Sequence, residues 1–177
     1  MADNNKFSFA DQDGVEKTSV LFQLTGDESC DDLLKCSKLT NSRFDTCAIY
    51  GNANVRENAI DCNRYCENIT FSSCSITGGN QSAIVVKGGC KNVRFIACNV
   101  TPSPKSWCDV LMDDWSDQSK NPSTGVDLTG LKRTDGKKLR IVFGRWTKPL
   151  YDERNARICW IKTIGLHAYN ILKGLVR

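Results

Sequence analysis

Residues 59–79 recur, position by position, 24 residues further along the chain. The first copy reads AIDCNRYCENITFSSCSITGG, and the second, residues 83–102, reads AIVVKGGCKNVRFIACNVTP. They align without a gap, and the pairs that match or nearly match are Ala59/Ala83, Ile60/Ile84, Cys66/Cys90, Asn68/Asn92, Ile69/Val93, Phe71/Phe95, Cys74/Cys98, Ile76/Val100 and Thr77/Thr101. A fixed period between about 20 and 50 residues is typical of stacked, solenoid-like folds.

An earlier copy, LTNSRFDTCAIYGN over residues 39–52, precedes these two at an offset of 27 residues. The three additional residues fall in the segment GNANVREN, residues 51–58. Insertions between repeats belong in loops, which tolerate changes in length. The sequence therefore contains three recognisable repeats rather than two.

Apolar residues alternate within each repeat, as in Ile69, Phe71 and Ile76. Short, alternating, β-branched and aromatic runs bounded by Gly, Asn and Pro predict strands, and no 3.6-residue period accompanies them. We therefore predict an all-β fold, a short right-handed parallel β-helix of about 3–4 coils with a C-terminal helical extension. Stacking of the coils predicts three columns of like residues: Phe44/Phe71/Phe95, Cys47/Cys74/Cys98 and a corner ladder of Asn41/Asn68/Asn92.

The repeat pattern predicts three parts of the chain: an N-terminal arm or cap (1–38), the β-helix (39–146) and a basic amphipathic C-terminal extension (147–177). After Pro102 the repeat weakens, and a constant period of 24 would place Val110 over Val86. LRIVF (139–143) is the strongest strand pattern, preceded by a turn at 134–137, and it forms either a last coil or a hairpin that caps the stack.

The segment from Tyr151 to Arg177 has a helical pattern of apolar residues with cations between them. Three roles are open for it: a cap on the end of the stack, a docking arm for a partner protein, or an interfacial membrane helix through residues 155–177. The N-terminal stretch lacks a basic start followed by an apolar run, so no secretory signal is expected.

The sequence contains ten cysteines. With no secretory signal expected, and with three cysteines predicted to stack in the core, we expect mostly reduced, buried thiols. The spacings of Cys30/Cys36 and Cys62/Cys66 are not the CxxC of a structural zinc site, and the only histidine is distant, at position 167. We predict no metal and no cofactor.

Charge is divided unevenly along the chain. Residues 1–130 carry 12 Lys and Arg against 17 Asp and Glu, a net of −5, whereas residues 131–177 carry 12 against 3, a net of +9. An acidic body with a basic end predicts contact with an anionic partner, or packing of the basic end on the acidic body. The predicted docking residues are Lys132, Arg133, Lys137, Lys138, Arg140, Arg145, Lys148, Arg154, Arg157, Trp160, Lys162, Lys173 and Arg177.

The phrases ENITFSSCSITGGN and KNVRFIACNVTP resemble coils of the pectin-lyase-like parallel β-helix superfamily, over roughly residues 31–115. The five-residue spacing of Phe71 and Ile76 also resembles pentapeptide-repeat solenoids, but that rhythm is not sustained. The first superfamily includes lyases, glycosidases, phage tailspikes and non-enzymatic virion proteins, so the resemblance implies a fold and leaves the function open.

The resemblance implies where catalysis would be found if the chain were an enzyme. The candidate acid and base carboxylates are Asp109, Asp113, Asp114 and Asp117. The Gly-His-Gly and Arg-x-Lys motifs of polygalacturonase-type glycosidases are absent from the sequence. In a lyase of the pectate type, Lys91 and Arg94 would act near Asp61 or Glu67.

The sequence favours a non-enzymatic structural or interaction protein over an enzyme. The resemblance to small phage and viral β-helix proteins implies a virion component, such as a decoration, vertex or tail-associated protein, in the virion or the cytoplasm. The expected partners are other structural proteins of a larger assembly, or further copies of this chain. The alternatives are a protein that binds or cleaves glycans through residues 101–125, and a peripheral membrane protein held by residues 155–177.

Overall fold

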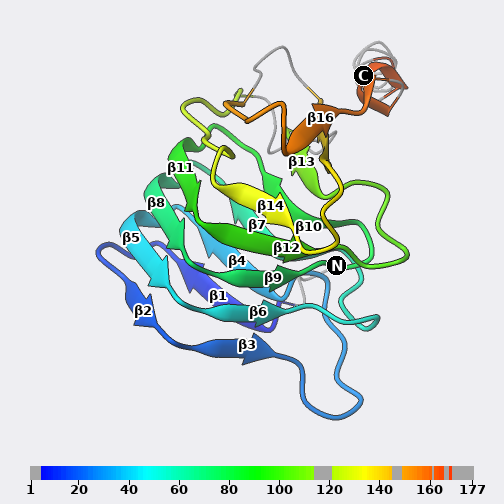
Figure 1. The fold of residues 1–177 in the computed structure, drawn as a ribbon. Coiled ribbons are helices and arrows are strands. Elements are labelled where there is room, and N and C mark those ends of the chain that lie inside the picture. The colour runs from blue at the N-terminus through cyan, green and yellow to red at the C-terminus, as the bar shows by residue number, and fades with distance from the viewer. Residues whose placement is uncertain (1–4, 114–120, 145–148, 161, 166–167, 169–177) are drawn as a thin grey trace.

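The chain winds into a parallel β-solenoid of about five coils (Figure 1). The computed structural model describes residues 5–113, 121–144, 149–160, 162–165 and 168. Each full coil contributes one short strand to each of three parallel sheets, which enclose a common apolar core. The predicted all-β parallel fold is confirmed, with more coils than the 3–4 that the repeats indicated.

The strands of the three sheets pair in parallel throughout. Sheet A contains β1 (Phe7–Ala10), β4 (Leu34–Ser37), β7 (Asn58–Asn63), β10 (Ser82–Val86), β13 (Val110–Met112), β15 (Leu139–Phe143) and β16 (Ala156–Ile158). Sheet B contains β2 (Glu16–Thr18), β5 (Thr40–Asp45), β8 (Glu67–Ser72) and β11 (Lys91–Ile96). Sheet C contains β3 (Leu21–Gln23), β6 (Ala48–Tyr50), β9 (Ser75–Thr77), β12 (Cys98–Thr101) and β14 (Leu131–Arg133).

Coil length varies, and this variation shifts one predicted register. Ile60 lies beside Ile84, as the 24-residue repeat predicts, but Ile84 lies beside Val110. The prediction of Val110 over Val86 is therefore wrong by two residues. The loop that contains Pro102 and Pro104 is longer than the corresponding loop of the previous coil, and it moves the next strand along.

The first coil begins well before residue 39. Strands β1, β2 and β3 pair with β4, β5 and β6, so residues 7–23 form a coil where the sequence indicated an arm or cap. Lys17 occupies the position that Phe44 has in the next coil, which hides the repeat. Its ammonium lies 5.6 Å from the ring centroid of Phe9, and the rings of Phe9 and Phe22 meet Phe44 edge-on.

The predicted aromatic column is confirmed at the centre of the core. Phe44 and Phe71 stack with ring centroids 4.8 Å apart, and Phe71 and Phe95 stack at 5.0 Å, with interplanar angles of 11° and 6°. These spacings match the separation of neighbouring strands, because each ring lies directly above its counterpart one coil away. The column therefore holds the coils in a single register.

The thiols line the same interior as small apolar groups. All ten cysteines are free, and all except the half-buried Cys159 are buried. In the predicted column, the backbone N–H of Cys74 donates to Sγ of Cys98 at 3.4 Å. Burial raises the pKa of the Cys30 thiol to about 11, so this thiol stays protonated at neutral pH.

A ladder of asparagines forms the corner before sheet B. Nδ2 of Asn92 donates to Oδ1 of Asn68 at 3.1 Å, and Nδ2 of Asn68 donates to Oδ1 of Asn41 at 2.9 Å. All three residues have the left-handed backbone conformation, with φ between 48° and 57°, which asparagine tolerates better than most residues. The ladder ends at Gly125, where a Cβ would lie 2.5 Å from Oδ1 of Asn92.

We expect Asn68→Ala to lower the free energy of unfolding by about 2 kcal/mol, because alanine loses both ladder hydrogen bonds and is strained at positive φ. Asn68→Gly loses the same bonds without the backbone strain, so it should cost about half as much. Urea denaturation measures both. An alanine variant as stable as the glycine variant would contradict this account of the corner.

The C-terminal segment begins as part of the solenoid. Strand β16 pairs with β15 in sheet A, and helical structure follows at Trp160 and residues 162–165. The helical pattern predicted from Tyr151 is therefore wrong for residues 151–158, where alternating burial of Ala156 and Ile158 makes a strand. In the part of the chain that the structure describes, no helix is long and apolar enough to cross a bilayer.

Candidate functional site

The two described members of the predicted carboxylate cluster, Asp109 and Asp113, flank strand β13 and are both buried. The backbone N–H and the hydroxyl of Ser123 donate to Asp113 at 2.9 and 3.0 Å. Asp114 and Asp117 lie outside the described residues. Each described carboxylate is thus engaged by its own donors.

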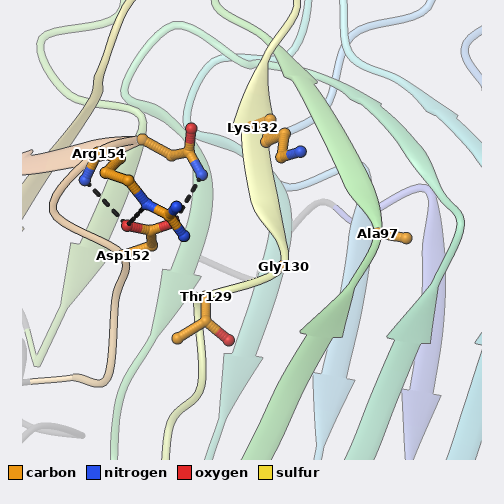
Figure 2. A pocket seen from close by; sticks show the side chains of 7 residues that line it. Ala97, Thr129, Gly130, Lys132, Asp152 and Arg154 are labelled. Atoms are coloured by element: carbon orange, nitrogen blue, oxygen red, sulfur yellow. Dashed lines mark hydrogen bonds and ion pairs between the residues drawn. The ribbon is translucent and has the colours of Figure 1, made fainter.

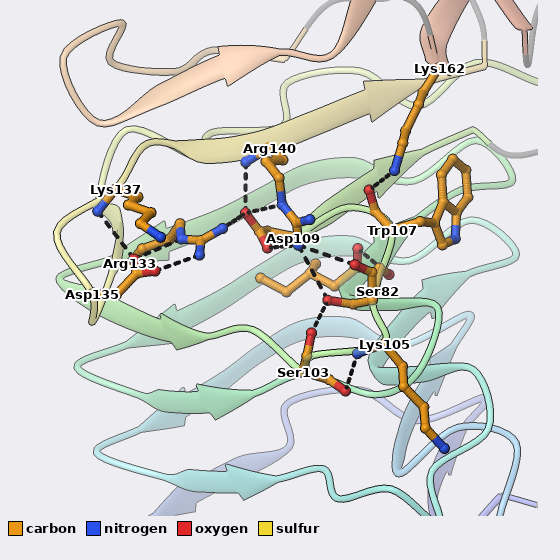
Figure 3. A network of polar contacts seen from close by, with 12 residues as sticks. Ser82, Ser103, Lys105, Trp107, Asp109, Arg133, Asp135, Lys137, Arg140 and Lys162 are labelled. Atoms are coloured by element: carbon orange, nitrogen blue, oxygen red, sulfur yellow. Dashed lines mark hydrogen bonds and ion pairs between the residues drawn. The ribbon is translucent and has the colours of Figure 1, made fainter.

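Asp109 holds two arginines in place (Figure 3). Its Oδ2 accepts from Nη1 of Arg133 at 3.0 Å and from the backbone N–H of Arg140 at 2.7 Å, and its Oδ1 accepts from Nη2 of Arg140 at 2.8 Å. Arg133 also pairs with Asp135 through Nη2 at 2.6 Å. The Arg133 side chain is only 9% exposed and that of Arg140 is 26% exposed, so both guanidiniums are fixed.

These arginines form the floor of a cationic hollow of about 570 Å³ at the corner between sheets C and A. The lining residues are Arg133, Gly136, Lys137, Lys138, Arg140 and Arg157. Arg140 and Arg157 are register partners on neighbouring strands, and like charges in that position repel each other. An anion bound between them would relieve this repulsion.

A second hollow has a volume of about 490 Å³ (Figure 2). It is lined by Ala97, Thr129, Gly130, Lys132, Asp152, Arg154 and Asn155. Lys132 lines this hollow, and its neighbour in sequence, Arg133, lines the larger one. We call the cations of both hollows the cationic rim: Lys132, Arg133, Lys137, Lys138, Arg140, Arg154 and Arg157.

The cationic rim keeps a positive balance after its internal contacts are counted. Its seven cations outnumber the three carboxylates that pair with them, those of Asp109, Asp135 and Asp152. Arg154 pairs with Asp152 at 3.1 Å. Among the described residues, neither Lys137 nor Arg157 has a carboxylate within ion-pair distance.

Of the remaining predicted docking residues, the structure describes Lys162 and Trp160 and leaves four outside its described part. Lys162 donates to the backbone carbonyl of Trp107, and its ammonium lies 5.5 Å from the centroid of the Trp107 ring. Trp160 is 59% exposed and Ile164 is 63% exposed, so the short helical segment presents an apolar pair to solvent. Arg145, Lys148, Lys173 and Arg177 lie outside the described residues.

Sequence reasoning missed a second polar cluster, on the outer side of sheet A. Nζ of Lys35 lies 3.3 Å from Oδ2 of Asp61 and 3.5 Å from Oδ2 of Asp32, and Nδ2 of Asn63 donates to Asp61 at 2.8 Å. All four side chains are buried. Among the described residues, the remaining oxygens, Oδ1 of Asp61 and Oδ1 of Asn63, have no hydrogen-bond partner.

Stability should depend on the ionisation of Asp61. Burial raises the pKa of this carboxyl to about 7, from 3.8 in an exposed chain, against the opposing influence of Lys87. The pKa of this carboxyl is higher in the folded protein than in the unfolded chain. The carboxyl therefore stabilises the folded protein at pH values below its unfolded pKa of 3.8, and this stabilisation is lost as pH rises through the folded pKa of about 7. The side chain of Asp61→Asn cannot ionise. Between pH 4 and pH 8, the free energy of unfolding of this variant should therefore rise relative to that of the wild type by roughly 2–4 kcal/mol.

Thermal unfolding of both proteins across that pH range measures the difference. Parallel stability curves for the wild type and Asp61→Asn would show that Asp61 does not titrate in this window.

Of the two carboxylates expected near Lys91 and Arg94, the structure places Glu67 beside Lys91 and Asp61 on another sheet. Lys91 and Arg94 lie on sheet B, whereas Asp61 lies on sheet A, and Lys91 has Glu67 as its register partner in the neighbouring coil. Among the described residues, no three His, Cys, Asp or Glu side chains are placed to hold a metal ion.

The fold and this site place the chain in the class of parallel β-solenoids with a cationic C-terminal end. Comparison with known proteins found no matching family, no matching curated protein and no matching solved structure.

Proposed function

We propose that the protein is a non-enzymatic interaction module of a larger assembly. The β-helix is its rigid body, and the cationic rim is the surface by which it docks onto an anionic partner. The observation that supports this most directly is the excess of charge in the rim, which lines two hollows toward one end of the stack. A rigid solenoid with one charged end suits a fixed attachment, because binding requires little ordering of the body.

The narrower proposal is a virion component, as a decoration, vertex or tail-associated protein. It rests on the resemblance of the repeats to coils of phage and viral β-helix proteins. The candidate carboxylates add support for a non-enzymatic role, since Asp109 is held by two arginines and Asp113 by Ser123.

Co-sedimentation of the tagged chain with particles from its source tests the docking function. The rim-neutral variant Lys137→Gln/Lys138→Gln/Arg157→Gln removes three cations without touching the Asp109 network. We expect it to remain in the supernatant, whereas the wild type pellets and is released as salt rises, because interactions between exposed charges are screened.

The matched control is Arg64→Gln/Lys91→Gln/Arg94→Gln, which removes three exposed cations that line neither hollow. It should pellet like the wild type. Equal loss in both variants would mean that total charge, rather than the cationic rim, governs the association.

A further inference from the structure

The shape of the cationic rim bears on what kind of anion it receives. The two hollows are concave, and the guanidinium of Arg133 lies at the floor of the larger one, 9% exposed. A flat membrane surface cannot reach such a floor, but a flexible strand can enter it. The cations are also distributed over both hollows, which matches a polymer with repeating charges better than a single small anion.

The donors of the rim suit phosphate groups. Asp109 orients two guanidiniums in advance, and Nη1 of Arg140 has no partner among the described residues. The two N–H groups of this nitrogen can donate to a phosphate oxygen, and a guanidinium that Asp109 already holds in place loses less entropy on binding. Lys137 and Arg157, at the edge of the hollow, supply mobile charge that can follow a phosphodiester backbone.

An exposed aromatic residue follows these cations in the chain. Trp160 follows Arg157 by three residues, a distance of at most about 10 Å along an extended chain. Its ring meets Phe143 edge-on with centroids 6.2 Å apart, which supports the ring while one face remains available. Grooves that combine cations with an exposed aromatic side chain are typical of proteins that bind single-stranded nucleic acid, since bases stack on the ring.

From these observations we infer that the cationic rim, together with Trp160, binds the phosphate backbone and a stacked base of single-stranded nucleic acid. This inference rests on the docking function proposed above and names the partner of the same surface. An acidic protein segment would use the cations, whereas a single strand of nucleic acid brings with each phosphate a base that can stack on Trp160.

Fluorescence anisotropy with a labelled deoxythymidine oligonucleotide of about 12 nucleotides tests the inference, since that length suits a site of this kind. We expect binding at about 50 mM salt, with an affinity that falls steeply toward 200 mM. Lys137→Gln/Arg157→Gln removes two phosphate contacts, so the slope of log K against log salt should become shallower by about 1.4.

The contribution of Trp160 is tested separately. Trp160→Ala should weaken binding by about 5–10-fold at constant salt slope, and Trp160→Phe should restore most of the affinity. Because the Trp160 ring is largely exposed, neither change should prevent folding, and the control variant Arg64→Gln/Lys91→Gln/Arg94→Gln should bind as the wild type does.

Three outcomes would overturn the inference. They are no oligonucleotide binding at low salt, equal or tighter binding to labelled poly-glutamate of the same length, and stronger binding to phosphatidylglycerol vesicles. If any of these occurs while the rim-neutral variant still fails to co-sediment with source particles, the docking function stands and only the identity of the partner is wrong.

Discussion

Replacing Phe71 with alanine should lower the free energy of unfolding by about 3–5 kcal/mol, which is the usual cost of removing a buried phenylalanine. Phe71 is fully buried and stacks on Phe44 on one side and on Phe95 on the other. The change therefore removes two ring contacts and opens a cavity in the middle of the column. Coils above and below cannot close this gap, because their strands are held by sheets on all three sides.

Urea denaturation measures this loss of stability, and two further variants serve as controls. Ile96→Ala, on the same strand as Phe95 with its side chain exposed, should change stability by less than about 0.5 kcal/mol. Phe71→Leu keeps most of the volume and should cost clearly less than alanine. A small effect of Phe71→Ala would mean that the stacked column does not hold the coils together.

Asp109→Ala should be comparably destabilising, by about 3–5 kcal/mol, because it leaves two fixed guanidiniums without their buried carboxylate. Arg133 and Arg140 donate to Asp109 from positions 24 and 31 residues further along the chain. The same change should also release both arginines from the floor of the larger hollow, so that binding to the anionic partner weakens.

The triple variant Asp109→Leu/Arg133→Met/Arg140→Met removes the whole ionic network and keeps apolar side chains in its place. In the same denaturation experiment, it distinguishes the cost of unpaired buried charges from the cost of lost packing. Replacing a buried ionic network by apolar side chains of similar size is often neutral, so much of the lost stability should return. Recovery of stability without recovery of binding is the expected pattern. If Asp109→Ala alone leaves stability unchanged, the network contributes little to the fold.

The sequence was sufficient to predict the middle of the molecule. Where coils repeat with identical residues, as at Asn68 and Asn92 or Phe71 and Phe95, the repeat specifies the register, because a shift of one residue would turn each strand inside out. The confirmed aromatic column and asparagine ladder follow from that rule.

Prediction failed where a coil departs from the repeat. Lys17 stands in the phenylalanine column of the first coil, so residues 7–23 did not resemble the others. Strand β16 is three residues long and lies within an apolar pattern that also fits a helix. In both places the register comes from pairing with the neighbouring coil, which local sequence does not encode.

The candidate site was predicted only in part. The excess of cations after residue 130 indicated a basic surface, but Asp109 was interpreted as a candidate catalytic group because its arginine partners lie one coil later. A search for opposite charges at separations of one coil, 24 to 31 residues here, would have paired Asp109 with Arg133 and Arg140 and Lys35 with Asp61. Burial of such pairs still requires the three-dimensional arrangement of sheet A.

The molar mass of the native particle that contains this chain, measured by light scattering in extracts of its source, tests the docking function most directly. Deleting residues 151–177 is unsuitable, because that segment contains strand β16. The rim-neutral variant Lys137→Gln/Lys138→Gln/Arg157→Gln avoids this problem. We predict a large particle for the wild type and the control variant, and a free chain of 19.7 kDa for the rim-neutral variant. A free monomer in all three cases would contradict the proposal that this protein docks through its cationic rim.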